Sequence, residues 1–315
     1  MSKILYVVIP CYNEQDVLHE TAKRLREKFL SLIDAGKIST QSRIVFVNDG
    51  SKDSTWKIIR DLHATDKIFS GINLSRNRGH QNALLAGLMT VKGGADMVIS
   101  MDADLQDDIN AIDEMIDKFN DGFDIVYGVR SKRTTDTFFK RFTAESFYKL
   151  VKFLGGDIIN NHADYRLMSK RALDGLAEFG EVNLFLRGLV PMIGYPSAIV
   201  YYERAERFAG ESKYPLKKML FFALQGITSL TVKPIRLIMI LGFAMCSISL
   251  LVILWTLYEY FFGSVVRGWT SMLASLWFIG GLILLSIGVV GEYVGKIYLE
   301  TKKRPRFIVS EFLND

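Results

Sequence analysis

Strand-like and helix-like segments alternate along the first 128 residues of the chain. Short β-rich apolar runs are separated by stretches in which apolar residues recur at helical spacing. The strand-like runs are at 3–9, 43–47, 68–74, 96–101 and 124–128, and the helix-like segments are at 14–33, 53–65, 81–91 and 109–119. Repeated strand–helix units predict an α/β fold in which helices cover both faces of a mainly parallel sheet.

After residue 128 the pattern loosens. The sequence predicts a long helix at 134–154 and one late strand at 197–202. The segment 215–232 reads as an apolar helix that carries Lys217 and Lys218. This combination is suited to a helix that lies along a membrane surface.

Two long apolar stretches follow residue 234. The first, 235–262, has one base, Arg236, and one acid, Glu259, both near its ends, and the second, 272–290, has no charged residue. About 20 helical residues cross the hydrocarbon layer of a membrane, so each stretch is long enough to span it. Buried core helices are the alternative, but they seldom stay free of charge over such a length. The two stretches therefore predict a transmembrane hairpin.

The charges beside the predicted spans give their orientation. Lysine and arginine residues cluster before the first span and after the second, whereas the connecting loop has only Arg267. The positive-inside rule then gives a multi-pass protein of the inner (plasma) membrane, and no stretch at the start of the chain resembles a signal peptide. The expected regions are a cytoplasmic domain at 1–212, a juxtamembrane amphipathic helix at 213–233, the transmembrane hairpin at 234–296 with spans at about 235–261 and 271–293, and a cytoplasmic tail at 297–315.

The formal net charge of +5 raises the question of nucleic-acid binding. Much of the excess lies beside the predicted spans, where a basic collar facing anionic headgroups explains it, so we expect no nucleic-acid partner. The chain has two cysteines, Cys11 in an early loop and Cys246 in a predicted span. A structural disulfide is not expected, which fits a reducing compartment.

Polar residues follow three of the predicted strands at the point where each strand ends. These clusters are at 10–14, 48–51 and 102–104. Any one of them could be an ordinary turn, because Asn, Asp, Gly and Ser dominate turns. Ligands of open α/β sheets bind beyond the carboxyl ends of the strands, so three clusters at that edge predict a binding site.

Asp102 and Asp104 come directly after the fourth predicted strand. Two carboxylates at this point can hold Mg²⁺ or Mn²⁺, which in turn takes diphosphate oxygens as ligands. The alternative is helix capping, with Asp107 and Asp108 taking part. The sequence has no G-x-G-x-x-G after its first strand and no G-x-x-x-x-G-K-[ST], which argues against a dinucleotide-binding dehydrogenase and a P-loop enzyme.

Seven segments of the chain, in their order, resemble those of one enzyme family. They are 8–14, 47–55, 77–79, 101–107, 164–169, 183–185 and 204–214. Together with the predicted hairpin they resemble the glycosyltransferase family 2 enzymes with a GT-A fold, most closely the bactoprenol glucosyltransferases and less closely dolichol-phosphate mannose synthase. The resemblance covers nearly the whole chain. It implies a Rossmann-like GT-A domain and inverting transfer of a hexose from a UDP-sugar to polyprenyl (undecaprenyl) phosphate, giving a lipid-linked monosaccharide for cell-envelope glycan modification.

The same resemblance implies roles for residues on the donor side. Asp104 would be the direct metal ligand, and therefore a catalytic residue, while Asp102 would lie near both the ribose and the metal. The implied pocket for the base and ribose comprises Pro10, Tyr12, Glu14 and Asp49.

On the acceptor side, Asp164 stands where the family places its base. The alternative is a structural carboxylate that is paired with Arg166. The residues implied to grip the acceptor phosphate near the membrane are Arg204, Arg207, Ser212 and Lys213. Arginine is well suited to bidentate phosphate contacts, although a face that meets lipid headgroups is the alternative for the two arginines.

The sequence also departs from the bactoprenol glucosyltransferase pattern. Ala163 and Tyr165 flank Asp164 where those enzymes usually have Gly and Phe, and the segment 79–82 differs too. The transferred sugar therefore stays open between glucose and an N-acetylhexosamine.

A processive polysaccharide synthase is a second hypothesis, although its Q-x-x-R-W motif and additional spans are not evident. A non-catalytic membrane scaffold is a third, although a scaffold has no need for the acidic motifs. Two spans are few to shelter a long prenyl chain, so we expect a homo-oligomer.

Overall fold

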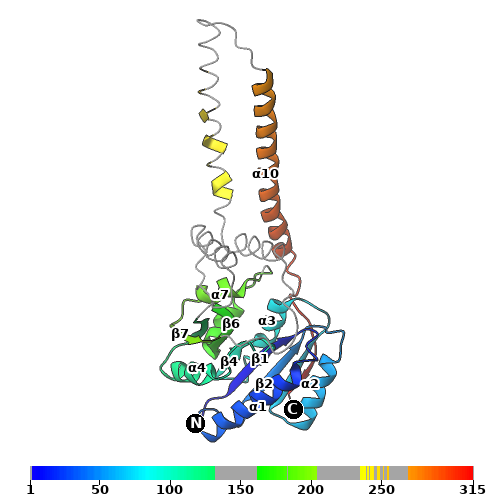
Figure 1. Cartoon of the computed structure of the whole chain (residues 1–315), viewed down its shortest axis with the longest axis vertical. Coiled ribbons are helices and arrows are strands. Elements are labelled where there is room, and N and C mark those ends of the chain that lie inside the picture. Colours follow the sequence, from blue (N-terminus) through cyan, green and yellow to red (C-terminus); the bar gives the residue numbers. More distant parts are fainter. Residues whose placement is uncertain are drawn as a thin grey trace.

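The structure, a computed structural model, describes residues 2–131, 162–182, 184–203 and 269–314, with a few residues between 235 and 254. The sheet and the helices packed on it lie within these ranges (Figure 1). The predicted helices at 134–154 and 215–232 lie outside the described residues, as do the four residues implied for the acceptor phosphate, Arg204, Arg207, Ser212 and Lys213.

One sheet holds eight strands of the described chain, in the order β7-β5-β6-β4-β1-β2-β3-β8. In chain order these are β1 (Leu5–Cys11), β2 (Arg43–Asn48), β3 (Phe69–Leu74), β4 (Met97–Ser100), β5 (Ile125–Arg130), β6 (His162–Ser169), β7 (Ser197–Tyr202) and β8 (Val309–Leu313). β1 pairs in parallel with β2 and β4, β2 with β3, and β5 with β7, which confirms the mainly parallel sheet. The antiparallel pairings join β6 to β4 and β5, and β8 to β3.

Helices cover both faces of the sheet, as the alternating pattern predicts (Figure 1). The first face carries α1 (Leu18–Asp34), α2 (Thr55–Thr65) and α4 (Ala111–Asn120), and the second carries α3 (His80–Val91), α6 (Lys170–Ala177) and α7 (Leu186–Met192). Because side chains alternate along a strand, Leu5, Val7 and Ile9 of β1 join the first core, while Tyr6 and Val8 join the second.

The strand β6 is a feature that the sequence pattern does not predict. It lies antiparallel between β4 and β5, and Ser100 of β4 pairs in register with Arg166 of β6. The sequence of β6 contains two charged residues, Asp164 and Arg166, which are both buried. A central strand is usually recognised by a continuous run of apolar residues, which β6 lacks. Its position brings Asp164 beside the end of β4.

A long helix, α10 (Trp269–Thr301), extends away from the sheet domain (Figure 1). Its segment Phe278–Thr301 is the one helix in the described ranges that is long and apolar enough to cross a membrane, and it exposes large apolar side chains such as Phe278 and Leu284. The predicted second span at 271–293 lies within α10, which continues beyond it. Most of the predicted first span at 235–261 lies outside the described residues, so the hairpin stays a prediction.

The expected cytoplasmic tail is partly a strand of the sheet. β8 pairs with β3, and the register places Phe312 opposite Ile72. The end of α10 is tied to the sheet domain as well, because the N–H of Val182 donates to Glu300 Oε2 at 2.8 Å. Arg306 Nη2 donates to the carbonyl of Phe179 at 2.6 Å. The sheet domain is therefore completed by residues that follow the apolar helix, beyond the predicted boundary at 212.

Candidate active site

The loops that follow β1 and β2 are joined at the carboxyl edge of the sheet. Cys11 pairs in register with Asn48, and the N–H of Asp49 donates to the carbonyl of Cys11 at 2.9 Å. Beyond the strands, the N–H of Asn13 donates to Ser51 Oγ at 3.0 Å, and the N–H of Lys52 returns a bond to Asn13 Oδ1 at 2.9 Å. The first two polar clusters therefore form one surface, as predicted.

The structure places the four residues of the implied base and ribose pocket around this surface. Pro10 is buried within β1, Tyr12 is exposed, and Glu14 is half-buried beside Thr55, whose hydroxyl accepts the Glu14 N–H at 3.0 Å. Asp49 is buried directly after β2. The roles of the four in binding a nucleotide stay predictions.

Asp49 holds the loop that precedes α3. The N–H of Arg78 donates to its Oδ1 at 2.7 Å, and the N–H of Gly79 donates to its Oδ2 at 2.9 Å. Burial raises the pKa of Asp49, while the two backbone N–H groups favour the charged form. The carboxylate thus fixes the 76–79 loop, a function that the sequence alone did not indicate.

Gly50 allows the 76–79 loop to approach this closely. Its φ is +63°, and a Cβ added there would lie 2.5 Å from the N of Asn77. We expect Gly50→Ala to push this loop from Asp49 and to raise the KM for the nucleotide donor by more than about tenfold, because small misplacements of binding groups are costly. Gly36→Ala is the matched control, since Gly36 has a φ of +70° and no atom within 4 Å of an added Cβ. Equal KM values for the two variants would contradict this role.

The loop after β4 carries Asp102 and Asp104 at the same edge of the sheet. Met101 donates its N–H to the carbonyl of Val8 at 3.2 Å, which brings this loop beside β1. Asp102 Oδ1 is buried, accepts no hydrogen bond, and lies 3.5 Å from His80 Nε2. Burial, together with the charges of Asp164 and Asp104, raises the pKa of Asp102, while His80 opposes the rise. A carboxylate oxygen without a hydrogen bond is suited to a divalent cation.

Asp102 and Asp104 fit a metal ion only if substrate phosphates and waters supply its other ligands. Among the residues that the structure describes, no three His, Cys, Asp or Glu side chains gather to hold a metal by themselves. Mg²⁺ in phosphate-transfer sites is commonly held by one or two carboxylates, with substrate phosphates and waters as the other ligands. Asp102 and Asp104 supply the hard oxygen donors that such a site needs.

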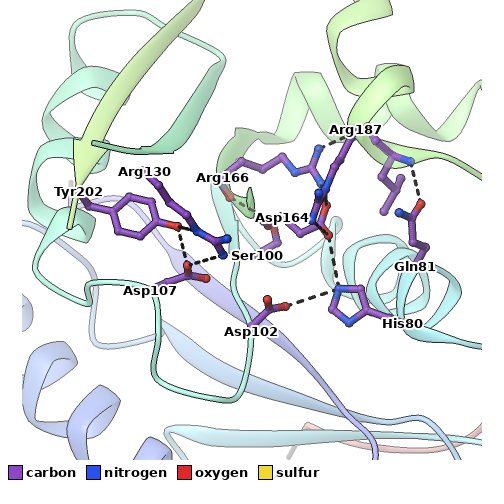
Figure 2. A network of polar contacts seen from close by, with 11 residues as sticks. His80, Gln81, Ser100, Asp102, Asp107, Arg130, Asp164, Arg166, Arg187 and Tyr202 are labelled. Carbon is purple, nitrogen blue, oxygen red and sulfur yellow. Dashed lines mark hydrogen bonds and ion pairs between the residues drawn. The ribbon is translucent and has the colours of Figure 1, made fainter. Parts of the chain in front are cut away.

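Asp164 lies in the first half of β6, surrounded by cations (Figure 2). Its Oδ1 accepts a hydrogen bond from Arg166 Nη2 at 2.8 Å, and its Oδ2 accepts one from Arg187 Nη2 at 3.1 Å. His80 Nε2 is 3.6 Å from Oδ2. Burial alone would raise the pKa of Asp164, but Arg187, His80 and Arg166 outweigh it and hold this pKa well below its ordinary value. The carboxylate is therefore a poor proton acceptor.

The ion pair between Asp164 and Arg166, which the sequence raised as an alternative, is present. Asp164 also lies close to Asp102. The hydroxyl of Ser100 donates to the carbonyl of Asp164, which ties β6 to the end of β4. His80 lies between Asp164 and Asp102 and joins the two acids (Figure 2). The structure thus places Asp164, predicted on the acceptor side, close to Asp102, predicted on the donor side.

Asp107 forms a second buried group that sequence reasoning had considered only for capping. Its Oδ1 accepts a hydrogen bond from the Tyr202 hydroxyl at 2.5 Å and lies 3.6 Å from Arg130 Nη2 (Figure 2). Burial, with the nearby charge of Asp102, raises the pKa of Asp107 to about 6. The group connects the loop of Asp102 and Asp104 to the ends of β5 and β7.

The comparisons with known proteins point to one family. A sequence profile of glycosyl transferase family 2 matches residues 6–176. An uncharacterized glycosyltransferase of Bacillus subtilis, YkoT, is 50% identical over 306 residues, which cover 97% of this chain and 91% of that protein. The bactoprenol glucosyl transferase of Shigella phage SfX is 42% identical over 305 residues, which cover 96% of this chain and 97% of that protein.

The chain belongs to glycosyl transferase family 2. Its mostly parallel α/β sheet is GT-A-like, and the protein is a glycosyltransferase, as the sequence indicated. Among solved structures, a mannosyltransferase of Pyrobaculum calidifontis in complex with GDP-Man and Mn²⁺ has a TM-score of 0.48 and 16% identity, over 95% of this chain and 85% of that chain. In this family 2 glycosyltransferase, Asp49 and Asp102, which follow β2 and β4, lie at the same edge of the sheet as Asp164, and His80 lies between Asp102 and Asp164.

Proposed function

We propose that this glycosyltransferase moves a hexose, glucose or an N-acetylhexosamine, from a UDP-sugar to a polyprenyl phosphate, with inversion at the anomeric carbon. The observation that carries the proposal is that Asp49, Asp102, Asp104 and Asp164 lie around His80 and its loop at one sheet edge. Relatives named bactoprenol glucosyl transferases match over nearly their whole length, which supports the prenyl phosphate acceptor.

The membrane placement is part of the same proposal. The apolar helix α10 emerges from the sheet domain and supports anchoring of the enzyme beside its lipid acceptor. Charge flanking the two apolar stretches supports a sheet domain and tail in the cytoplasm. Self-association would shelter the long prenyl chain, and cross-linking in membranes tests it.

The reaction needs no proton acceptor on the protein. An oxygen of the lipid phosphate attacks the anomeric carbon, the bond from that carbon to the diphosphate oxygen breaks, and UDP leaves with the electron pair. The acceptor is already largely anionic at neutral pH, so Asp164 acts through the cations that it holds. Mg²⁺ or Mn²⁺ bound at Asp104 and Asp102 would stabilise negative charge on the departing diphosphate.

Incubation of membranes with labelled UDP-sugars and polyprenyl phosphate tests the proposal. We expect one sugar to appear in a solvent-extractable lipid-linked monosaccharide. Label in an insoluble polymer would instead indicate a processive synthase. No product from any donor, together with no heat of binding for UDP and Mn²⁺, would indicate the non-catalytic scaffold.

A further inference from the structure

Two partly exposed nitrogen donors, the guanidinium of Arg187 and the imidazole of His80, lie over the buried Asp164. The Arg187 side chain is 39% exposed and the His80 side chain 41%, whereas that of Asp164 is 7% exposed. Both point toward the same carboxylate oxygen, Oδ2, from different helices (Figure 2). Two nitrogen donors are therefore accessible on the side of the site where Asp164 lies.

Arg187 is the second of two arginines that pair with Asp164. Arg166, whose side chain is 1% exposed, already forms a buried ion pair with Asp164 at 2.8 Å. With Arg187 added, two arginines share this one buried carboxylate. A partly exposed ion pair stabilises a fold only weakly, so stability gives little reason for the second arginine.

The position of Arg187 is fixed by the contact between α7 and α3. Gln81 Oε1 accepts the N–H of Leu186 at 2.9 Å, so the residue before Arg187 is bonded to the residue after His80 (Figure 2). Asp164 then orients the Arg187 guanidinium through Nε at 3.3 Å and Nη2 at 3.1 Å. A guanidinium that is held in one plane is suited to binding phosphate oxygens.

We propose that Arg187 and His80, oriented by Asp164, form a binding site for a phosphate group, and that this group is the phosphate of the lipid acceptor. The inference rests on the proposed function. The donor diphosphate has the same chemistry and is the other source, because His80 also lies 3.5 Å from Asp102. Asp164 is then a positioning residue, and Arg187 and His80 contact the substrate.

Steady-state kinetics of Arg187→Gln and Arg187→Lys test the site. We expect Arg187→Gln to raise the KM for polyprenyl phosphate at least about tenfold and to leave the KM for the UDP-sugar within about twofold, since a charged hydrogen bond is lost at one ligand only. Arg187→Lys, which keeps the charge but not the planar fork, should fall between this variant and the wild type. His80→Gln should change the same KM in the same direction.

The matched control is Arg171→Gln. Arg171 also pairs with a carboxylate, that of Asp124, and it is 60% exposed, but it lies on α6 at the opposite edge of the sheet. This variant should keep both KM values. Thermal unfolding of each variant in detergent checks that Arg187→Gln remains folded. If Arg187→Gln does not fold, the KM values of Arg187→Lys decide the test.

Each outcome has a defined meaning. A rise only in the KM for the UDP-sugar would keep the phosphate site but overturn its assignment to the acceptor. If Arg187→Gln and Arg187→Lys lower the melting temperature but leave both KM values unchanged, the phosphate site is overturned. Arg187 would then have only a structural role. A wild-type enzyme that makes no lipid-linked sugar from any donor would refute the proposed function, which is a separate failure.

Discussion

Asp104→Ala is expected to lower the kcat for sugar transfer by at least about 100-fold, because removing a group that stabilises transition-state charge has effects of this size. The wild type should lose activity in EDTA and recover it with Mn²⁺ or Mg²⁺. Titration calorimetry with Mn²⁺ and UDP should show that the variant has lost metal-dependent nucleotide binding. The response of the folded wild type to EDTA and to added metal shows whether the ion itself is needed for transfer.

Asp121→Ala is the control for this variant. Asp121 is an exposed acid at the end of α4 with the same charge, and it should keep its activity within about twofold, as surface substitutions usually do. Activity that survives both EDTA and the Asp104→Ala substitution would remove the metal from the mechanism. The metal assignment would then have to be abandoned, although the sugar-transfer reaction could stand.

The parallel part of the fold was predictable because its signals are local. Each of β1 to β5 is a short apolar run beside a helical pattern, and the late strand at 197–202 is β7. β6 and β8 were not predicted, since each depends on a distant partner. β8 pairs with β3, which lies far earlier in the chain, and β6 contains a buried ion pair that only its neighbours make favourable.

The candidate site divides in the same way. Asp49, Asp102 and Asp104 follow parallel strands, whose carboxyl ends must meet at one edge, so the sequence was enough to place them together. Asp107 and Tyr202 are bonded across 95 residues of sequence, and Arg187 reaches Asp164 from a helix that the pattern did not predict. Such partners are set by tertiary packing. The short spacing between Asp164 and Arg166 was the one local signal of the ion pair.

Asp164→Ala is expected to destabilise the protein by about 3–5 kcal/mol, because it leaves the guanidinium of Arg166 buried without its carboxylate. Denaturant unfolding of the purified enzyme in detergent measures the loss.

The pKa of Asp164 is lower in the folded protein than the ordinary value of about 3.9. Its contribution to stability is therefore present above that value and is lost as the pH falls through the folded pKa. Because Asp164 then stays ionised above about pH 5, the rate of the wild-type enzyme should show no change caused by titration of Asp164 between about pH 5 and 9.

A double variant separates the structural role of Asp164 from its role in transfer. Asp164→Ala combined with Arg166→Met removes both buried charges, so most of the lost stability should return. Arg187 and His80 would still lack the carboxylate that orients them, and activity should stay low. Full recovery of activity in this variant would show that Asp164 only neutralises Arg166. Recovery of stability without activity would show that Asp164 does more than neutralise Arg166, as expected of a carboxylate that orients Arg187 and His80 toward the substrate.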